Sequence, residues 1–125
     1  MYNYNTRIEI DGNDGTGKST LVASLRGMGF TNVHDRGDMT KATDDNSIGP
    51  TGGVVYILLV CPWGVSKSRL LKRNADMTDF YHSDTSLEHY DTRFRELAGK
   101  FGAHVIQSIY KQATLVRVLN ILDVH

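Results

Sequence analysis

The sequence is poor in several residue types that mark particular protein classes. It has a single cysteine, Cys61, which excludes an internal disulfide and a cysteine-based zinc cluster. Only 2 of its 125 residues are proline, and the 40% hydrophobic and 22% charged content is typical of a globular rather than a disordered chain. Its longest uncharged apolar run, Val54 to Trp63, is too short to span a bilayer.

The chain also lacks an excess of either charge, with 14 Lys+Arg against 14 Asp+Glu. Nonspecific nucleic-acid binding driven by net charge is therefore not expected. The first residues do not resemble a secretory signal. We expect a single domain over residues 1–125, long enough to bury a core, with no membrane partner. The expected location is the cytoplasm, or the host cytoplasm if the protein is viral.

A glycine-rich motif follows the first predicted strand, Arg7 to Asp11, and precedes a predicted helix from Lys18 to Met28. The motif, G-N-D-G-T-G-K-S-T, fits the phosphate-loop pattern G-x-x-x-x-G-K-[ST]. Glycines let backbone N–H groups face a phosphate, and the helix N-terminus favours negative charge. The predicted nucleotide-binding residues are Gly12, Asn13, Asp14, Gly15, Thr16, Gly17, Lys18, Ser19 and Thr20.

This motif predicts ATP and Mg²⁺ as the bound groups. Lys18 is expected to reach the β- and γ-phosphates, and the Ser19 hydroxyl is expected to ligate the metal. Asp35 stands at the predicted end of a strand, where a carboxylate can hold Mg²⁺ through water. Asp14 and Asp35 could equally be ordinary turn residues.

The rest of the chain alternates strands with helices. The pattern predicts three further strands: a short one around Val33, one from Val54 to Val60 and one from His104 to Gln107. A long loop is predicted from Arg36 to Gly53. Three helices are predicted: a basic helix from Ser66 to Arg73, a helix that opens with the capping pair Thr85 and Glu88, and a helix from Tyr110 to Leu122. This alternation favours an α/β fold with a largely parallel sheet.

Two patterns bear on the core. The helix after residue 85 carries an apolar stripe, expected to be core rather than a platform for a nucleobase: Leu87, Tyr90, Phe94, Leu97 and Phe101. Glu9 interrupts the strand from Arg7 to Asp11, although a central parallel strand should be apolar on both faces. Either a second subunit, hence a homodimer, or the loop from Arg36 to Gly53 is expected to cover that face.

The opening I-E-I-D-G-N-D-G-T-G-K-S-T resembles the first segment of thymidylate kinases and related deoxynucleoside monophosphate kinases, a family of P-loop kinases. Asp11 and Asp14 match carboxylates of that family, and Asp35-Arg36 matches its Asp-Arg pair. The segments Y-I-L-L-V-C-P and S-x-x-R-L-x-x-R resemble its strand leading into a lid. The resemblance implies a three-layer P-loop NTPase-type fold with a small, mainly parallel sheet and a lid at about residues 67–86.

The resemblance also implies roles for individual residues. Arg36 would bind the acceptor phosphate, and the lid arginines Arg69 and Arg73 would join Lys18 in neutralising the transferred charge. Asp14 would contact the acceptor's sugar hydroxyl. The alternative for the basic helix is a solvated surface face. On residue pattern alone, His82 is expected to be a surface residue of the lid, and Arg93 is a weaker candidate for the site.

The chain is shorter than is typical of that family, in a phage- or virus-like form. Most of the helices that hold the acceptor nucleoside are missing between Met28 and Val54. The leading hypothesis is ATP-dependent phosphoryl transfer to a (deoxy)nucleoside monophosphate, whose ionised phosphate needs no strong base. One alternative is a kinase of a nucleoside or polynucleotide 5′-hydroxyl, with Asp35 as base. The other is a module that binds or sequesters nucleotides without turnover.

Overall fold

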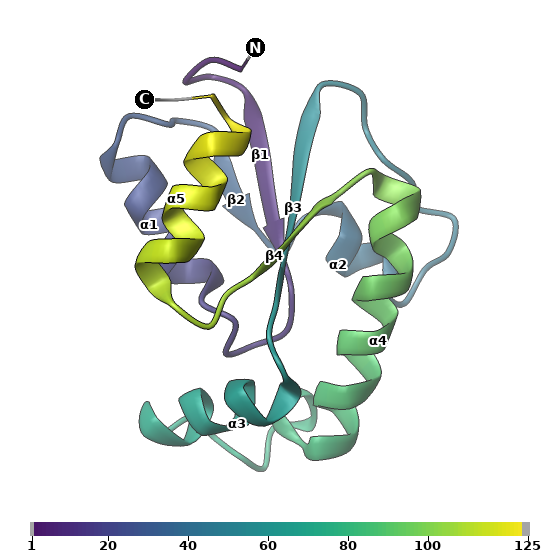
Figure 1. Cartoon of the computed structure of the whole chain (residues 1–125). Helices are drawn as coiled ribbons and strands as arrows, with labels where there is room; N and C mark the ends of the chain where they lie inside the picture. Colours follow the sequence, from purple (N-terminus) through teal and green to yellow (C-terminus); the bar gives the residue numbers. More distant parts are fainter. Residues whose placement is uncertain (1, 124–125) are drawn as a thin grey trace.

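The computed structural model describes residues 2–123, and its centre is a four-stranded sheet (Figure 1). The strands are β1 (Arg7–Asp11), β2 (Val33–Asp35), β3 (Val54–Val60) and β4 (His104–Gln107), in the order β2-β1-β3-β4. All three pairings are parallel, with Ile10 beside both Asp35 and Ile57. The predicted α/β class, the four strands and the central place of β3 are therefore confirmed.

Helices cover both faces of this sheet (Figure 1). One face packs against α1 (Lys18–Gly27) and α5 (Lys111–Ile121), and the other against α2 (Asp38–Ala42) and α4 (Asp84–Phe101). The helix α3 (Trp63–Lys72) and the short 3₁₀ helix η1 (Phe80–His82) follow β3. Within residues 2–123, no helix combines the length and apolar character needed to cross a membrane.

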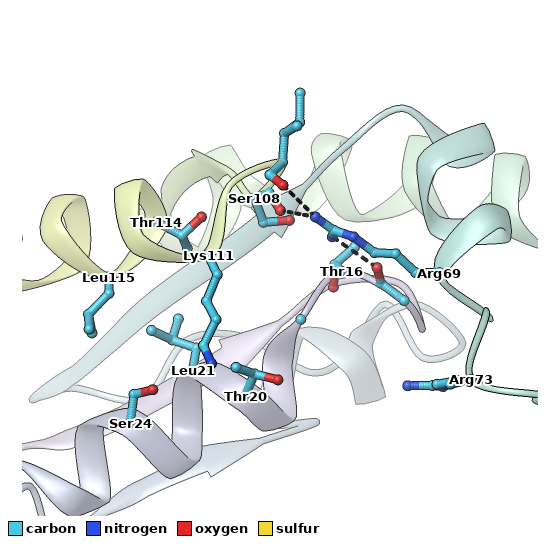
Figure 2. A pocket seen from close by; sticks show the side chains of 13 residues that line it. Thr16, Thr20, Leu21, Ser24, Arg69, Arg73, Ser108, Lys111, Thr114 and Leu115 are labelled. Carbon is cyan, nitrogen blue, oxygen red and sulfur yellow. Dashed lines mark hydrogen bonds between the residues drawn. The ribbon is translucent and has the colours of Figure 1, made fainter. Parts of the chain in front are cut away.

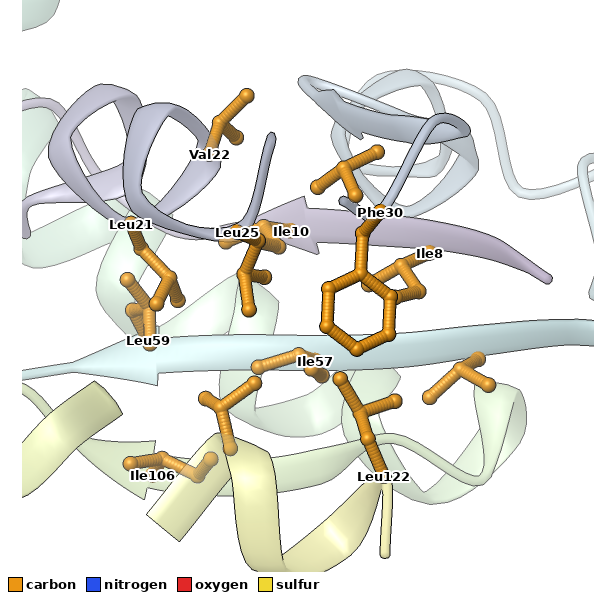
Figure 3. Packing of buried hydrophobic residues seen from close by; sticks show 13 residues of the cluster. Ile8, Ile10, Leu21, Val22, Leu25, Phe30, Ile57, Leu59, Ile106 and Leu122 are labelled. Atoms are coloured by element: carbon orange, nitrogen blue, oxygen red, sulfur yellow. The ribbon is translucent and has the colours of Figure 1, made fainter. Parts of the chain in front are cut away.

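Strand β3 divides its side chains between two cores. Val55, Ile57 and Leu59 face α1 and α5, where Leu25 and Phe30 join them (Figure 3). The alternate residues belong to the core under α2 and α4: Tyr56, Leu58 and Val60, with Phe94, Leu97 and Phe101. Because successive strand residues point to opposite faces, an apolar run buried on both faces is what β3 needs.

The strand β1 differs from this pattern, and the expectation that a central strand is apolar on both faces is wrong for it. Ile8 and Ile10 enter the core under α1, while Glu9, 2% exposed, faces α2. Glu9 Oε1 accepts a hydrogen bond from the Asp38 N–H at 2.6 Å, and Asp11 Oδ1 accepts one from the Gly37 N–H at 2.8 Å. The two carboxylates thus bind the free N–H groups at the start of α2.

The segment from Arg36 to Gly53 is consequently not a structureless loop throughout, because α2 lies within it. Met39 and Ala42 are fully buried in the core under α4, which explains why so short a helix is held in place. The sequence predicts that either a second subunit or the segment from Arg36 to Gly53 covers the face of β1 that carries Glu9. The structure shows this segment there.

Two helix starts also differ from the prediction. The N-cap of α4 is Ser83, whose Oγ accepts a hydrogen bond from the Ser86 N–H at 3.2 Å, so the Thr85–Glu88 pair is not the cap. Helix α3 begins at Trp63 instead of Ser66, directly after Pro62. The fixed φ of a proline suits a helix start, and the apolar pattern alone could not show this.

Candidate functional site

The glycine-rich loop between β1 and α1 is held against β3 and α3 by close backbone contacts. A Cβ atom on Gly12 would lie 2.5 Å from the Leu59 carbonyl oxygen, and one on Gly15 would lie 2.6 Å from the Ser66 carbonyl oxygen. Both glycines have positive φ, 145° and 84°. A side chain at either position would therefore displace the loop.

Side chains within the loop fix its shape further. Thr16 Oγ1 donates to the Asn13 carbonyl oxygen at 2.6 Å, across the loop. Asn13 Nδ2 donates to the Leu87 carbonyl oxygen at 2.6 Å, which links the loop to α4. These two hydrogen bonds brace the loop.

The N-terminus of α1 opens from this loop without a side-chain cap. Its N-cap is Gly17, with φ 91°, and no side chain accepts a hydrogen bond from the first turn. Uncapped first-turn N–H groups bind anions well. A polar cavity of about 100 Å³ lies here, lined by Asn13, Asp14, Gly15, Gly17, Lys18, Ser19, Thr20, Asp35, Arg36 and Arg73.

Lys18 lies at the inner end of this polar cavity and is only 7% exposed. Its Nζ donates to the Gly12 carbonyl oxygen and lies 3.7 Å from Asp14 Oδ1. Burial lowers the pKa of Lys18 below its ordinary value, while the negative charge of Asp14 acts in the opposite direction. Asp14 therefore helps to keep this buried ammonium group charged.

The Asp14 carboxylate contacts three basic side chains, those of Lys18, Arg36 and His82. Its Oδ1 accepts from Arg36 Nη2 at 3.3 Å, and its Oδ2 lies 2.9 Å from His82 Nε2. Burial by itself would raise the pKa of Asp14, but Lys18, His82 and Arg36 together lower it. The expectation that His82 is a surface residue is wrong, since it is 9% exposed and contacts this loop.

The predicted Asp35-Arg36 pair lies at the carboxyl end of β2, beside the loop. Arg36 has a left-handed backbone, with φ 53°, which is uncommon for a residue with a Cβ. Its N–H bonds to the Ile10 carbonyl oxygen at 3.2 Å, and its exposed side chain returns to Asp14. Asp35 is exposed and lines the polar cavity.

A second cavity, of about 300 Å³, adjoins the polar one on the side of α5. We call it the α5-side cavity; it is lined by Gly15, Thr16, Gly17, Thr20, Leu21, Ser24, Arg69, Arg73, Ser108, Ile109, Lys111, Thr114 and Leu115. The Lys111 side chain reaches from α5 towards α1 (Figure 2). The walls are mostly loop backbone, hydroxyl groups and aliphatic side chains.

Arg69 and Arg73, which share a face of α3 in the sequence pattern, have different environments. The Arg69 guanidinium donates to the carbonyl oxygens of Gly15 at 3.1 Å, Ser108 at 2.5 Å and Ile109 at 2.8 Å (Figure 2). Arg69 therefore ties the phosphate loop to the segment after β4. Arg73 is exposed and lines both this cavity and the polar one.

A third cavity, of about 240 Å³, lies on the other side of the loop. We call it the α4-side cavity; its lining is Gly12, Asn13, Asp14, Lys18, Arg36, Thr40, Thr43, Asp44, Tyr81, Tyr90 and Phe94. Tyr90 and Phe94, expected only as core, thus also face a cavity. The Tyr81 and Tyr90 rings lie 5.5 Å apart between centroids, so one wall is aromatic.

Several lining residues lie outside the sequence prediction. Ser108 to Lys111 follow β4, and the rule that ligands bind beyond the carboxyl ends of parallel strands could have identified them. No local pattern marks His82 or Tyr81. Arg93, a weak candidate, donates to the carbonyl oxygens of Ala42 and Thr43, which places it at the end of α2 and outside the three cavities.

Metal binding by protein ligands alone is not supported, since residues 2–123 hold no group of three His, Cys, Asp or Glu side chains fit for an ion. Mg²⁺ usually keeps several waters and binds through one or two protein oxygens plus phosphate. Ser19 and Asp35 both line the polar cavity and could supply such oxygens. The residues present therefore fit a phosphate-bound Mg²⁺ ion.

No family model matches the chain. The chain is similar to the bifunctional cordycepin biosynthesis cluster protein 3 of the fungus Cordyceps militaris, at 30% identity over 131 aligned positions. The match covers 81% of this chain but 15% of that protein, so the chain spans a small part of its length.

Proposed function

We propose that the protein transfers the terminal phosphoryl group of ATP to a (deoxy)nucleoside monophosphate, in the manner of thymidylate kinase-like P-loop enzymes. The observation that carries this proposal is the arrangement of the three cavities. The polar cavity shares Gly15, Gly17, Thr20 and Arg73 with the α5-side cavity, and Asn13, Asp14, Lys18 and Arg36 with the α4-side cavity. The polar cavity thus joins two separate cavities, an arrangement that supports a reaction between two nucleotides.

The two cavities suit different partners of that reaction. The α5-side cavity adjoins the start of α1 and would hold the base and sugar of ATP. The α4-side cavity, with its aromatic wall and Arg36, would hold the acceptor, because aromatic rings stack on bases and the guanidinium fork pairs with phosphate oxygens. The transferred group would lie between them at Lys18.

Positioning and charge neutralisation are the chemical tasks in such a transfer. Lys18 would bind phosphate oxygens by leaving its present partner, the Gly12 carbonyl. Arg36 and Arg73 would add positive charge from the two sides, whereas Arg69 would position the loop, because its donors are already bound to carbonyls. Ser19 and Asp35 would hold Mg²⁺, which supplies charge neutralisation at the phosphates when bound.

The test is labelled ATP with Mg²⁺ offered to each common nucleoside monophosphate, to free nucleosides and to a 5′-hydroxyl oligonucleotide. We expect a labelled diphosphate from at least one monophosphate, and loss of at least about a hundredfold in transfer for Lys18→Ala. Label on a free hydroxyl would favour the alternative with Asp35 as base. Tight ATP binding by calorimetry with no product from any acceptor would favour a binding module, and transfer unchanged in Lys18→Ala would reject the assignment of the loop.

A further inference from the structure

His82 is not part of the site that the sequence predicts, yet it joins the segment before α4 to the phosphate loop. Its Nε2 lies 2.9 Å from Asp14 Oδ2, and its Nδ1 lies 2.7 Å from the Asp76 carbonyl oxygen. At 9% exposure the ring is nearly buried. A histidine bound on both nitrogens at such depth has a fixed orientation.

Local hydrogen bonds shape the segment that carries this ring. The Asp76 carboxylate accepts from the N–H and hydroxyl of Thr78, at 2.9 and 2.6 Å, so only its carbonyl oxygen is directed at His82. Asp79 Oδ1 accepts from the Tyr81 N–H at 2.8 Å and starts η1. The segment is thus folded on itself and presents the imidazole to the loop.

Both partners of the ring are acceptors. A backbone carbonyl can only accept a hydrogen bond, and an ionised carboxylate likewise only accepts. Asp14 is kept ionised by Lys18 and Arg36, which lie 3.7 and 3.3 Å from its Oδ1. The Nε2–H of His82 is therefore the group that can donate to Asp14.

His82 is the nearest of the basic side chains around the Asp14 carboxylate. Asp14 is 2.9 Å from His82 but 3.7 Å from Lys18, whose Nζ is bound to the Gly12 carbonyl. Without His82, the carboxylate would be free to turn away from the wall of the α4-side cavity. With His82 in place, Asp14 stays on the wall of the α4-side cavity, beside Arg36.

We propose that His82 is a positioning residue, which holds Asp14 through its Nε2 and so fixes the acceptor side of the site. This inference rests on the proposed function for the identity of the acceptor. The competing explanation is purely structural: His82 would serve only to anchor the segment through the Asp76 carbonyl. Two variants separate these roles, because glutamine places its amide near the Nε2 position of histidine and asparagine places it near Nδ1.

His82→Gln should keep the contact with Asp14, and His82→Asn should keep only the contact with Asp76. We expect the Asn variant to raise the acceptor KM about tenfold, with the donor KM within about twofold, and the Gln variant to stay within about threefold on both. Equal values for the two variants, or a larger defect for Gln, would overturn the proposal. In an Asp14→Asn background the two variants should no longer differ, and thermal melting of each checks its folding.

A second measurement does not depend on phosphoryl transfer. In the ¹⁵N NMR spectrum of the protein without nucleotide, the Nε2 resonance of the His82 ring should report its hydrogen bond to Asp14, and Asp14→Asn should change the ring resonances. His89, exposed on α4, is the matched control and should not change. If no acceptor is ever phosphorylated, the proposed function fails while this measurement still decides the His82–Asp14 contact; identical His82 resonances in the two proteins would reject that contact.

Discussion

The two cavities beside the phosphate loop are built from different parts of the chain. On the α5 side, the walls combine loop backbone, small hydroxyl or aliphatic side chains and the basic side chains of Arg69, Arg73 and Lys111. On the α4 side, the walls include acidic, basic and aromatic side chains, among them Asp14, Arg36 and Tyr90. Of the residues that line these two cavities, acidic and aromatic side chains occur on the α4 side alone. The α4 side should therefore determine which molecule is selected.

The strongest test of this difference is Arg36→Ala. Loss of a charged, two-pronged contact with phosphate should raise the acceptor KM by about 30- to 100-fold, with the donor KM within about threefold. Steady-state kinetics with each substrate varied in turn measures both values. Arg95→Ala, on the exposed side of α4, is the control. Equal losses for donor and acceptor would remove the distinction between the cavities.

The next effect concerns the start of α2, the helix that supplies Thr40 to the α4-side cavity. A Cβ on Gly37 would overlap the Glu9 carboxylate that binds the start of α2, so Gly37→Ala should lower the free energy of unfolding by about 2 kcal/mol. Urea unfolding measures this loss. Gly99→Ala is the matched control, because no atom lies within 4 Å of a Cβ there, and it should leave stability unchanged or slightly raised. A Gly37 variant as stable as wild type would contradict the role of Glu9.

Arg69→Lys addresses the α5 side alone. A lysine cannot bond to the carbonyls of Gly15, Ser108 and Ile109 in the geometry of the guanidinium fork, so ATP affinity should fall about tenfold while the acceptor KM stays within about twofold. Calorimetric titration with ATP gives the first value. Lys72→Ala, exposed at the end of the same helix, should bind ATP as wild type does. A defect confined to the acceptor would contradict the assignment of the two sides.

The smallest effect is a dependence on pH. The pKa of Asp14 lies below its ordinary value of 3.8 in the folded protein. Its ionised form therefore stabilises the fold fully at pH values above 3.8, and this stabilisation is lost as the pH falls below that value. The difference in unfolding free energy between wild type and Asp14→Asn should hence be constant above about pH 5 and shrink in more acidic solution. Urea unfolding at neutral and acidic pH measures it. A difference that grows on acidification would exclude the ion pairs described here.

Much of the fold can be predicted because its signals are local. The alternation in β1, the doubly apolar β3 and the stripe on α4 each depend on residues close in the sequence. The burial of Glu9 cannot be interpreted in this way. Arg7, two residues away, binds its Oε2, but the N–H that binds its Oε1 belongs to Asp38, which the chain brings near only after β2 has paired. Helix α2 has the same origin: five residues form a helix because their apolar side is buried.

The same difference between local and distant contacts separates the predictable residues of the candidate site from the others. The glycine-rich loop between β1 and α1 can be predicted because its residues are consecutive. Arg69 and Arg73 cannot be distinguished by pattern, since residues four apart share a helix face, and only the carbonyls of a distant segment give them different environments. The prediction for His82 is wrong because its ring contacts Asp14, which is 68 residues away in the sequence.

The contacts of Arg69 have a consequence for the order of events during synthesis. The phosphate loop leaves the ribosome early, whereas two of the three carbonyls that hold Arg69 belong to Ser108 and Ile109. A nascent chain that lacks these residues has the whole motif but not the contact that joins it to the α5 side. If the chain binds ATP as proposed, this ability should thus arise late, after β4 has docked.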